Sequence, residues 1–144
     1  MPTSRSLIDD RLLIARLVGE RVRLPRIGLG TTSYWYYRAC RAAALGAGGH
    51  LSGPFERLAP ADQRAAIGTL LELRDDIGLP DPRATVPLMV QLAARYERLN
   101  LLNLEAAAAA RVLSATVWLS ESGAAGVLPE VLDAEGVRWS SIAV

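Results

Sequence analysis

The sequence predicts a three-layer α/β/α domain built on a central, mostly parallel sheet. Three observations lead to this class: short apolar runs of strand length stand near both ends of the chain, segments with apolar residues at helical spacing separate them, and the order is strand–helix, a helical middle, then helix–strand–helix–strand. Because parallel strands need crossover connections, this order favours helices on both faces of the sheet. With 144 residues, we expect one domain over residues 1–144.

The composition excludes several classes of protein. The chain has sixteen basic residues, all of them Arg, fifteen acids, and a formal charge of +1. A single Cys excludes a disulfide framework and a multi-cysteine zinc site. Charged residues interrupt every apolar stretch before it reaches the ~18–20 residues of a membrane span, and Met1–Asp10 lacks the apolar stretch of a secretory signal. We therefore expect a soluble, cytoplasmic protein without a membrane segment.

The chain opens with a strand and a helix. Ser6–Asp9 is a short apolar run that ends in acids, and apolar residues at helical spacing follow it up to Gly19, the expected helix stop. The strand presents Asp9 or Asp10 at its carboxyl end, and Asp10 is the better helix cap by position. Val22–Gly30, punctuated by Pro and Gly, suits an edge strand or a connecting arm.

The middle of the chain is predicted to be helical. Helices are expected over Thr32–Leu45, over Ala61–Arg74, and from near Pro82–Pro87 to Arg98. A glycine-rich break follows the first of these helices, and His50–Pro60 is expected to be a surface loop.

The C-terminal part supplies the remaining strands. An Ala-rich helix is predicted over Leu104–Leu113, and a buried strand over Thr116–Leu119. A helix over Gly126–Ala134 and a strand over Val137–Ile142 close the chain. In such a sheet, ligands bind outside the carboxyl ends of the strands.

This order of elements, with an acid closing the first strand, resembles the PIN domain, the fold of bacterial toxin ribonucleases of the VapC type. Leu7–Ala15 is similar to the opening strand and helix of that family. Leu104–Ser114, Ala115–Glu121 and Leu128–Ile142 are similar to its late helix, the strand that follows, and its closing helix and strand. The resemblance implies a metal-dependent ribonuclease of a toxin–antitoxin pair, with an antitoxin as protein partner.

The chemistry of that family needs three or four carboxylates around one or two Mg²⁺ or Mn²⁺ ions, because hard cations take oxygen ligands. The resemblance assigns these positions to Asp9, Asn103 and Glu121, with Asp9 and Glu121 as the catalytic carboxylates. The acid of the second helix is missing, because Thr31–Ala42 contains no Asp or Glu. Two of four carboxylates are thus lost. This pattern predicts a degenerate active site in which Mg²⁺ or Mn²⁺ binds weakly or not at all.

Each candidate ligand also has a structural interpretation. Asp9 is either a metal ligand or the cap of the first helix, and Asn103 is either a neutralised ligand or the cap of the Ala-rich helix. Glu105 either complements the dipole of that helix or acts as a displaced carboxylate. Glu121 either faces the site or lies in solvent.

Two stretches are candidate binding surfaces. The run Tyr34–Tyr37 holds half of the eight aromatic residues and stands beside Arg38 and Arg41. Part of this run must be core, but exposed Tyr34 or Tyr37 with the two Arg could stack bases or anchor a protein interface. A second stretch, with Arg at positions 16, 21, 23 and 26, either contacts phosphates or partner acids, or is a solvated face.

These observations favour a non-catalytic PIN-like module that binds RNA or a protein partner. The alternative is a weak Mg²⁺- or Mn²⁺-dependent ribonuclease that uses Asp9 and Glu121. Since PIN domains often pair through helices, we expect a homodimer.

Overall fold

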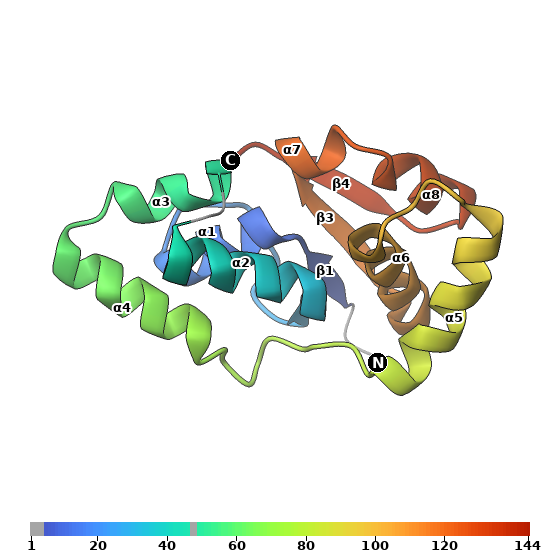
Figure 1. Ribbon diagram of the computed structural model, residues 1–144, viewed down its shortest axis with the longest axis horizontal. Helices are drawn as coiled ribbons and strands as arrows, with labels where there is room; N and C mark the ends of the chain where they lie inside the picture. The colour runs from blue at the N-terminus through green and yellow to red at the C-terminus, as the bar shows by residue number, and fades with distance from the viewer. Residues whose placement is uncertain (1–4, 47–48) are drawn as a thin grey trace.

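The computed structural model describes residues 5–46 and 49–144. Its centre is a four-stranded sheet in the order β2-β1-β3-β4, in which every neighbouring pair is parallel. The strands are β1 (Ser6–Ile8), β2 (Leu29–Gly30), β3 (Thr116–Ser120) and β4 (Trp139–Ile142). Helices cover both faces (Figure 1), so the predicted three-layer α/β/α class is confirmed.

Alternating side chains of β1 and β3 divide the core into two clusters. Leu7 pairs in register with Val117, and Ile8 pairs with Trp118. Leu7 and Val117 belong to one buried cluster, while Ile8 and Trp118 pack into the other. This is the expected result for strands whose successive side chains point to opposite faces of a sheet that is covered on both sides.

The Leu7 face is covered by helices from the C-terminal half of the chain: α5 (Pro82–Arg95), α6 (Leu101–Leu113) and α8 (Leu128–Ala134). The run Ala106–Ala110 of α6 is almost completely buried in this cluster. Because alanine side chains are small, α6 can approach the sheet closely. The predicted Ala-rich helix is therefore confirmed as the inner helix of this layer.

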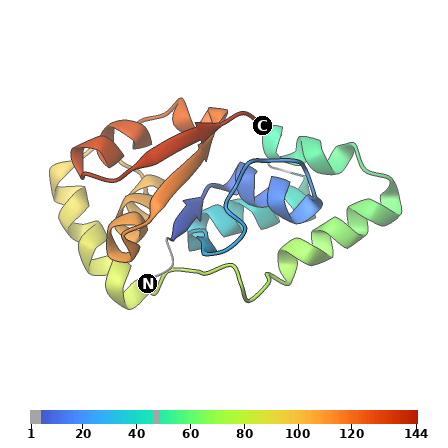
Figure 2. The same ribbon diagram turned by 180° about the vertical axis from the view of Figure 1, so that it is seen from behind.

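The Ile8 face is covered by elements from the N-terminal half (Figure 2). They are α1 (Asp10–Val18), α2 (Ser33–Leu45), the 3-10 helix η1 (Gly49–Ser52), α3 (Gly53–Glu56) and α4 (Pro60–Leu71). Helix α2 contributes to both clusters, since Trp35 packs with the first and Ala39 with the second. Helices α4 and α5 lie at opposite ends of the molecule, joined by an extended segment (Figure 1).

Several predicted boundaries are wrong for local reasons. The expected loop over His50–Pro60 contains η1 and α3, because Leu51 and Phe55 are drawn into the Ile8 cluster. Of the segment Val22–Gly30, predicted as an edge strand or a connecting arm, Leu29–Gly30 forms the edge strand β2. Helix α6 begins at Leu101, three residues early, because the side chain of Asn100 caps it.

Two helix ends follow the sequence signals. Helix α1 stops at Gly19, which adopts the left-handed conformation that glycine tolerates (φ 84°). Helix α8 gives way to Gly136, also at positive φ. The predicted Gly126–Ala134 helix is present as α8, which begins two residues later, and a separate short helix, α7 (Glu121–Ala124), precedes it. Within residues 5–46 and 49–144, no helix has the length and apolar character needed to span a bilayer.

Candidate functional site

The candidate site lies where the carboxyl ends of β1 and β3 meet. The chain passes from β1 to β2 on one side and returns to β3 on the other, so the connections leave β1 and β3 in opposite directions. Such a topological switch point opens a crevice in parallel α/β folds, and ligands bind there. Asp9 follows β1 directly, and Ser120 is the last residue of β3.

Asp9 bridges this crevice with hydrogen bonds. Its Oδ1 accepts the backbone N–H of Leu12 at 2.9 Å, which makes Asp9, rather than the predicted Asp10, the cap of α1. Its Oδ2 accepts both the backbone N–H of Ser120 at 2.8 Å and the Ser120 hydroxyl at 2.6 Å. The residue is only 1% exposed. Asp9 therefore connects β1, α1 and β3.

Burial raises the pKa of the Asp9 carboxyl above its ordinary value. The hydrogen bonds from Ser120 and Leu12 and the nearby charge of Arg11 act in the opposite direction. Arg11 is itself held by two hydrogen bonds to Glu20, each 3.0 Å long. The carboxylate is thus stabilised mainly by neutral donors in a desolvated position.

A hollow of about 170 Å³ lies beside Asp9. Asp10 lines it, and its Oδ2 is 3.4 Å from Nε of Arg38, a residue of α2. Asn103 of α6 and Ser122 of α7 also line it, whereas the exposed Glu121 does not. Of the predicted site residues, Asp9 and Asn103 thus line the same hollow, and Glu121 does not.

Several contacts of these residues would compete with a Mg²⁺ or Mn²⁺ ion. Both oxygens of Asp9 already accept hydrogen bonds, and Oδ2 accepts two. Oδ1 of Asp10 accepts the backbone N–H of Arg11, and its Oδ2 faces the Arg38 guanidinium. In the part of the chain that the structure describes, no group of three or more His, Cys, Asp or Glu residues could hold a metal. The Arg38 guanidinium lies beside one of the two carboxylates that line the hollow.

The contacts of Arg38 and Glu105 could not be predicted from the sequence. Arg38 faces Asp10 only because α2 crosses near the start of α1, and no local pattern signals that pairing. Glu105, a candidate displaced carboxylate, instead accepts the backbone N–H groups of Ser33 and Tyr34 at 3.2 and 2.8 Å. It complements the dipole of α2 rather than that of its own helix.

The predicted binding residues Tyr34, Tyr37, Arg38 and Arg41 line one hollow of about 270 Å³ between α2 and the start of α6. Tyr34 and Tyr37 also line an adjoining hollow of about 370 Å³ against α5. The two tyrosine rings meet edge to face, with centroids 6.2 Å apart and planes at 77°. We call these two hollows together the α2–α5–α6 groove.

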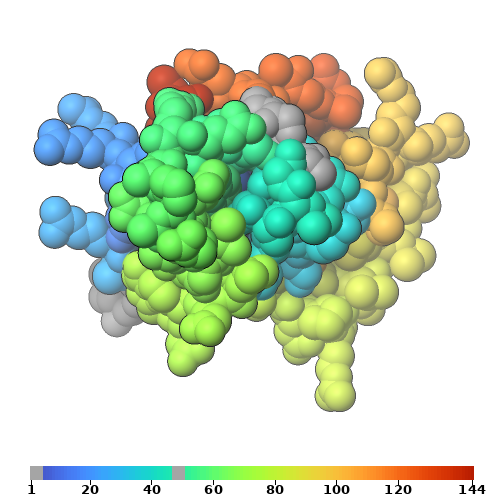
Figure 3. All heavy atoms as spheres, turned by 60° about the vertical axis from the view of Figure 1, so that its left-hand side comes forward, coloured from blue at the N-terminus to red at the C-terminus, as the bar shows by residue number. Residues whose placement is uncertain are grey.

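The basic stretch after α1 lies elsewhere. Arg21, Arg23 and Arg26 are exposed, and Figure 3 shows long side chains of this blue segment extending into solvent on the opposite side of the view from the cyan helix α2. In this view, the two stretches lie on different sides of the molecule.

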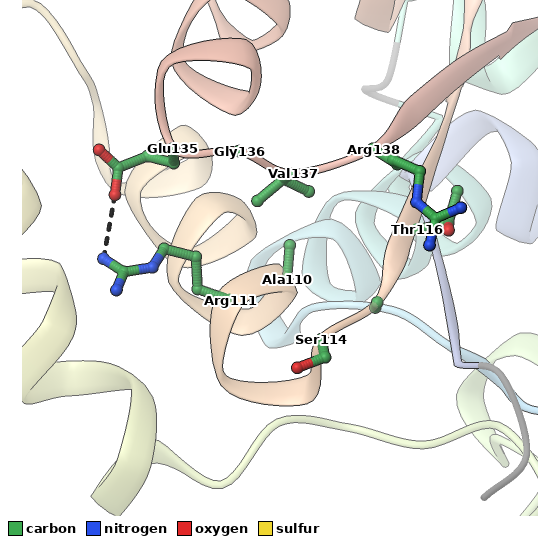
Figure 4. Close-up of a pocket in the computed structure, with 9 residues that line it drawn as sticks. Ala110, Arg111, Ser114, Thr116, Glu135, Gly136, Val137 and Arg138 are labelled. Atoms are coloured by element: carbon green, nitrogen blue, oxygen red, sulfur yellow. Dashed lines mark hydrogen bonds and ion pairs between the residues drawn. The ribbon is translucent and has the colours of Figure 1, made fainter.

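A polar hollow of about 330 Å³ lies at the amino ends of β3 and β4, away from Asp9. Figure 4 shows Glu135 and Arg111 facing each other beside it. The Glu135 side chain, 4% exposed, also accepts hydrogen bonds from Arg95 and from the Tyr96 hydroxyl at 2.6 Å. The bond to Glu135 raises the pKa of Tyr96. These contacts join α5, α6 and the end of α8, which gives the cluster a structural role.

Comparison with known proteins supports the fold. No protein-family model matches the sequence, and no curated protein matches it. Among solved structures, the chain is similar to VapBC-1 from nontypeable Haemophilus influenzae, with a TM-score of 0.53 and 15% sequence identity. The match covers 94% of this chain and 96% of that one. The predicted PIN-like fold class is confirmed by this likeness.

Replacing Gly123 with Ala should destabilise the protein by about 1–3 kcal/mol, the usual range for overpacking a filled site. A Cβ on Gly123 would collide with Oδ2 of Asp9, so the Asp9–Ser120 contact must move. Gly126→Ala is the matched control, because its Cβ meets only the Gly123 carbonyl oxygen at 4.0 Å. Urea denaturation followed by circular dichroism measures both. Equal stabilities for the two variants would contradict the tight packing around Asp9.

The stability difference between wild type and Asp9→Asn should depend on pH. Because burial raises the pKa of folded Asp9, the folded state holds this proton more tightly than the unfolded state does. The wild type must then lose stability relative to Asp9→Asn as the pH rises above about 4, the ordinary pKa of Asp, until folded Asp9 has ionised. Denaturation of both proteins from pH 4 to pH 8 tests this, and a constant difference would refute it.

Proposed function

We propose that the chain is a non-catalytic PIN-like module that binds another protein through the α2–α5–α6 groove. The observation that supports the non-catalytic assignment is that the two carboxylate oxygens of Asp9 accept three hydrogen bonds from the chain itself. The Arg38 guanidinium beside Asp10 adds to it, because this fixed cation opposes a second cation in the same hollow.

The second half of the proposal is supported by the groove. Tyr and Arg are the residue types enriched at protein interfaces, and two of each line one hollow. The likeness to VapBC-1 and the sequence resemblance to VapC-type toxins both favour a protein partner of the antitoxin kind. Homodimer formation and a cytoplasmic location stay predictions from the sequence.

A weak metal-dependent ribonuclease is the second candidate. Asp9, Asp10 and Asn103 line the same hollow at the switch point, and this convergence favours it. To bind through Oδ2 of Asp9, a metal would have to displace Ser120, and to bind Oδ2 of Asp10 it would have to displace Arg38. Each step removes hydrogen bonds or an ion pair that the folded protein already has.

A ribonuclease assay separates the two candidates. Purified protein is incubated with single- and double-stranded RNA in Mn²⁺, in Mg²⁺ and in chelator, beside Asp9→Asn and Glu121→Gln. We expect no cleavage above background in any metal and no difference among the three proteins, because Asp9 is engaged and Glu121 faces solvent. Cleavage that needs metal and is lost in Asp9→Asn would overturn the non-catalytic assignment, and its loss in Glu121→Gln too would make Glu121 part of the site.

A further inference from the structure

The α2–α5–α6 groove has an apolar end and a cationic end. Toward α5, its lining includes Val86, Met89 and Leu101, of which Val86 is 50% and Leu101 59% exposed. At the other end, the lining includes Arg38 and Arg41. Large apolar side chains this exposed, next to polar groups, are typical of a surface that another molecule covers.

The carboxylates near the groove are already engaged. Both oxygens of Glu105 accept backbone N–H groups of α2, and Asp10 faces Arg38. Arg41 is exposed, and within residues 5–46 and 49–144 no carboxylate lies at ion-pair distance from it. The free charge that the groove offers is therefore positive, and its complement is an acid supplied by the partner.

The geometry favours a protein segment over a nucleic acid. Successive bases stack on aromatic faces, but Tyr34 and Tyr37 meet edge to face at 77°, so they do not form two parallel platforms. The side chains of Val86, Met89 and Leu101 carry no charge or hydrogen-bond donor that could bind a phosphate, but they can bury the apolar side chains of a protein segment.

The groove also favours a helical segment. Its lining comes mainly from three helices, α2, α5 and α6, and a helix presents no row of unpaired backbone groups to which an added strand could bond. The part of α2 that carries the two tyrosines is anchored to the rest of the protein. Trp35, which follows Tyr34, is buried, and the Tyr36 hydroxyl donates a hydrogen bond to the Leu70 carbonyl at 2.7 Å. Such a preformed groove lowers the entropic cost of binding.

We infer that the groove binds an amphipathic helix of another protein whose apolar side chains lie against Val86, Met89 and Leu101 and whose carboxylate pairs with Arg41. This inference rests on the proposed function and specifies the chemistry of the partner. The positive charge of Arg41 selects against basic segments, while Tyr34 and Tyr37 form the wall between the apolar and the charged end.

A peptide selection tests this on the full chain. A phage library of helix-forming 16-residue peptides, with one face randomised, is selected on the immobilised protein and depleted on Tyr37→Ala. We expect the recovered peptides to carry Asp or Glu beside apolar residues. By fluorescence anisotropy, a recovered peptide should bind Arg41→Glu about tenfold more weakly than the wild type, as expected for the loss of a charge pair worth about 1.4 kcal/mol. Arg64→Glu, which changes an exposed Arg of α4, is the control and should leave the affinity for the peptide almost unchanged.

A charge reversal makes the test decisive. Changing the peptide acid to Lys should weaken binding to the wild type and restore binding to Arg41→Glu. Circular dichroism melts establish that each variant is folded. If the peptides lose affinity for Tyr37→Ala but bind the wild type and Arg41→Glu equally well, this inference is overturned and the proposed function is left intact.

Three further outcomes count against the inference. The absence of any peptide that needs Tyr37 overturns both the inference and the proposed binding site. A labelled ten-nucleotide single-stranded RNA that binds the wild type but not Tyr37→Ala assigns the groove to nucleic acid. A dimer by light scattering that dissociates in Tyr37→Ala assigns it to a second copy of the chain.

Discussion

The hydrogen bonds between the Asp9 carboxylate and Ser120 hold together the part of the fold on which the candidate site depends. They join the carboxyl ends of β1 and β3, the two central strands, across the topological switch point. The same carboxylate caps α1. Because Asp9 is buried, these bonds replace the water that an ionised carboxylate would otherwise keep. The chain itself thus occupies the acceptor positions of Oδ2 of Asp9 at this crevice.

The position of the Asp9 carboxylate restricts which side chains can lie around it. Gly123 has no Cβ, and a Cβ there would strike Asp9. Arg38 supplies positive charge next to Asp10. Tyr37 and Arg41, exposed residues of the same helix α2 as Arg38, line the neighbouring groove, where a partner can reach them. Function therefore shifts, in our proposal, from the strand ends to the neighbouring groove.

The sequence predicts the layers but not the contacts between them. Apolar spacing identifies the strands and long helices because burial acts over several residues at once, and it places Asp9 at a strand end. It cannot choose between Asn100 and Asn103 as a cap, because both are favoured at that position. It cannot tell that Ser122 rather than Glu121 lines the hollow, since one residue on a helix turns the side chain by about 100°. The pairing of Arg38 with Asp10 depends on how α2 crosses α1, which no local pattern encodes.

In our proposal, Asp9 is a structural connection and not a metal ligand. A crystal structure of the protein grown in millimolar Mn²⁺, with anomalous diffraction data, tests it most directly. We expect no anomalous peak in the hollow beside Asp9, with both oxygens of Asp9 still bonded to Ser120 and Leu12. A peak coordinated by either oxygen of Asp9 would contradict this proposal.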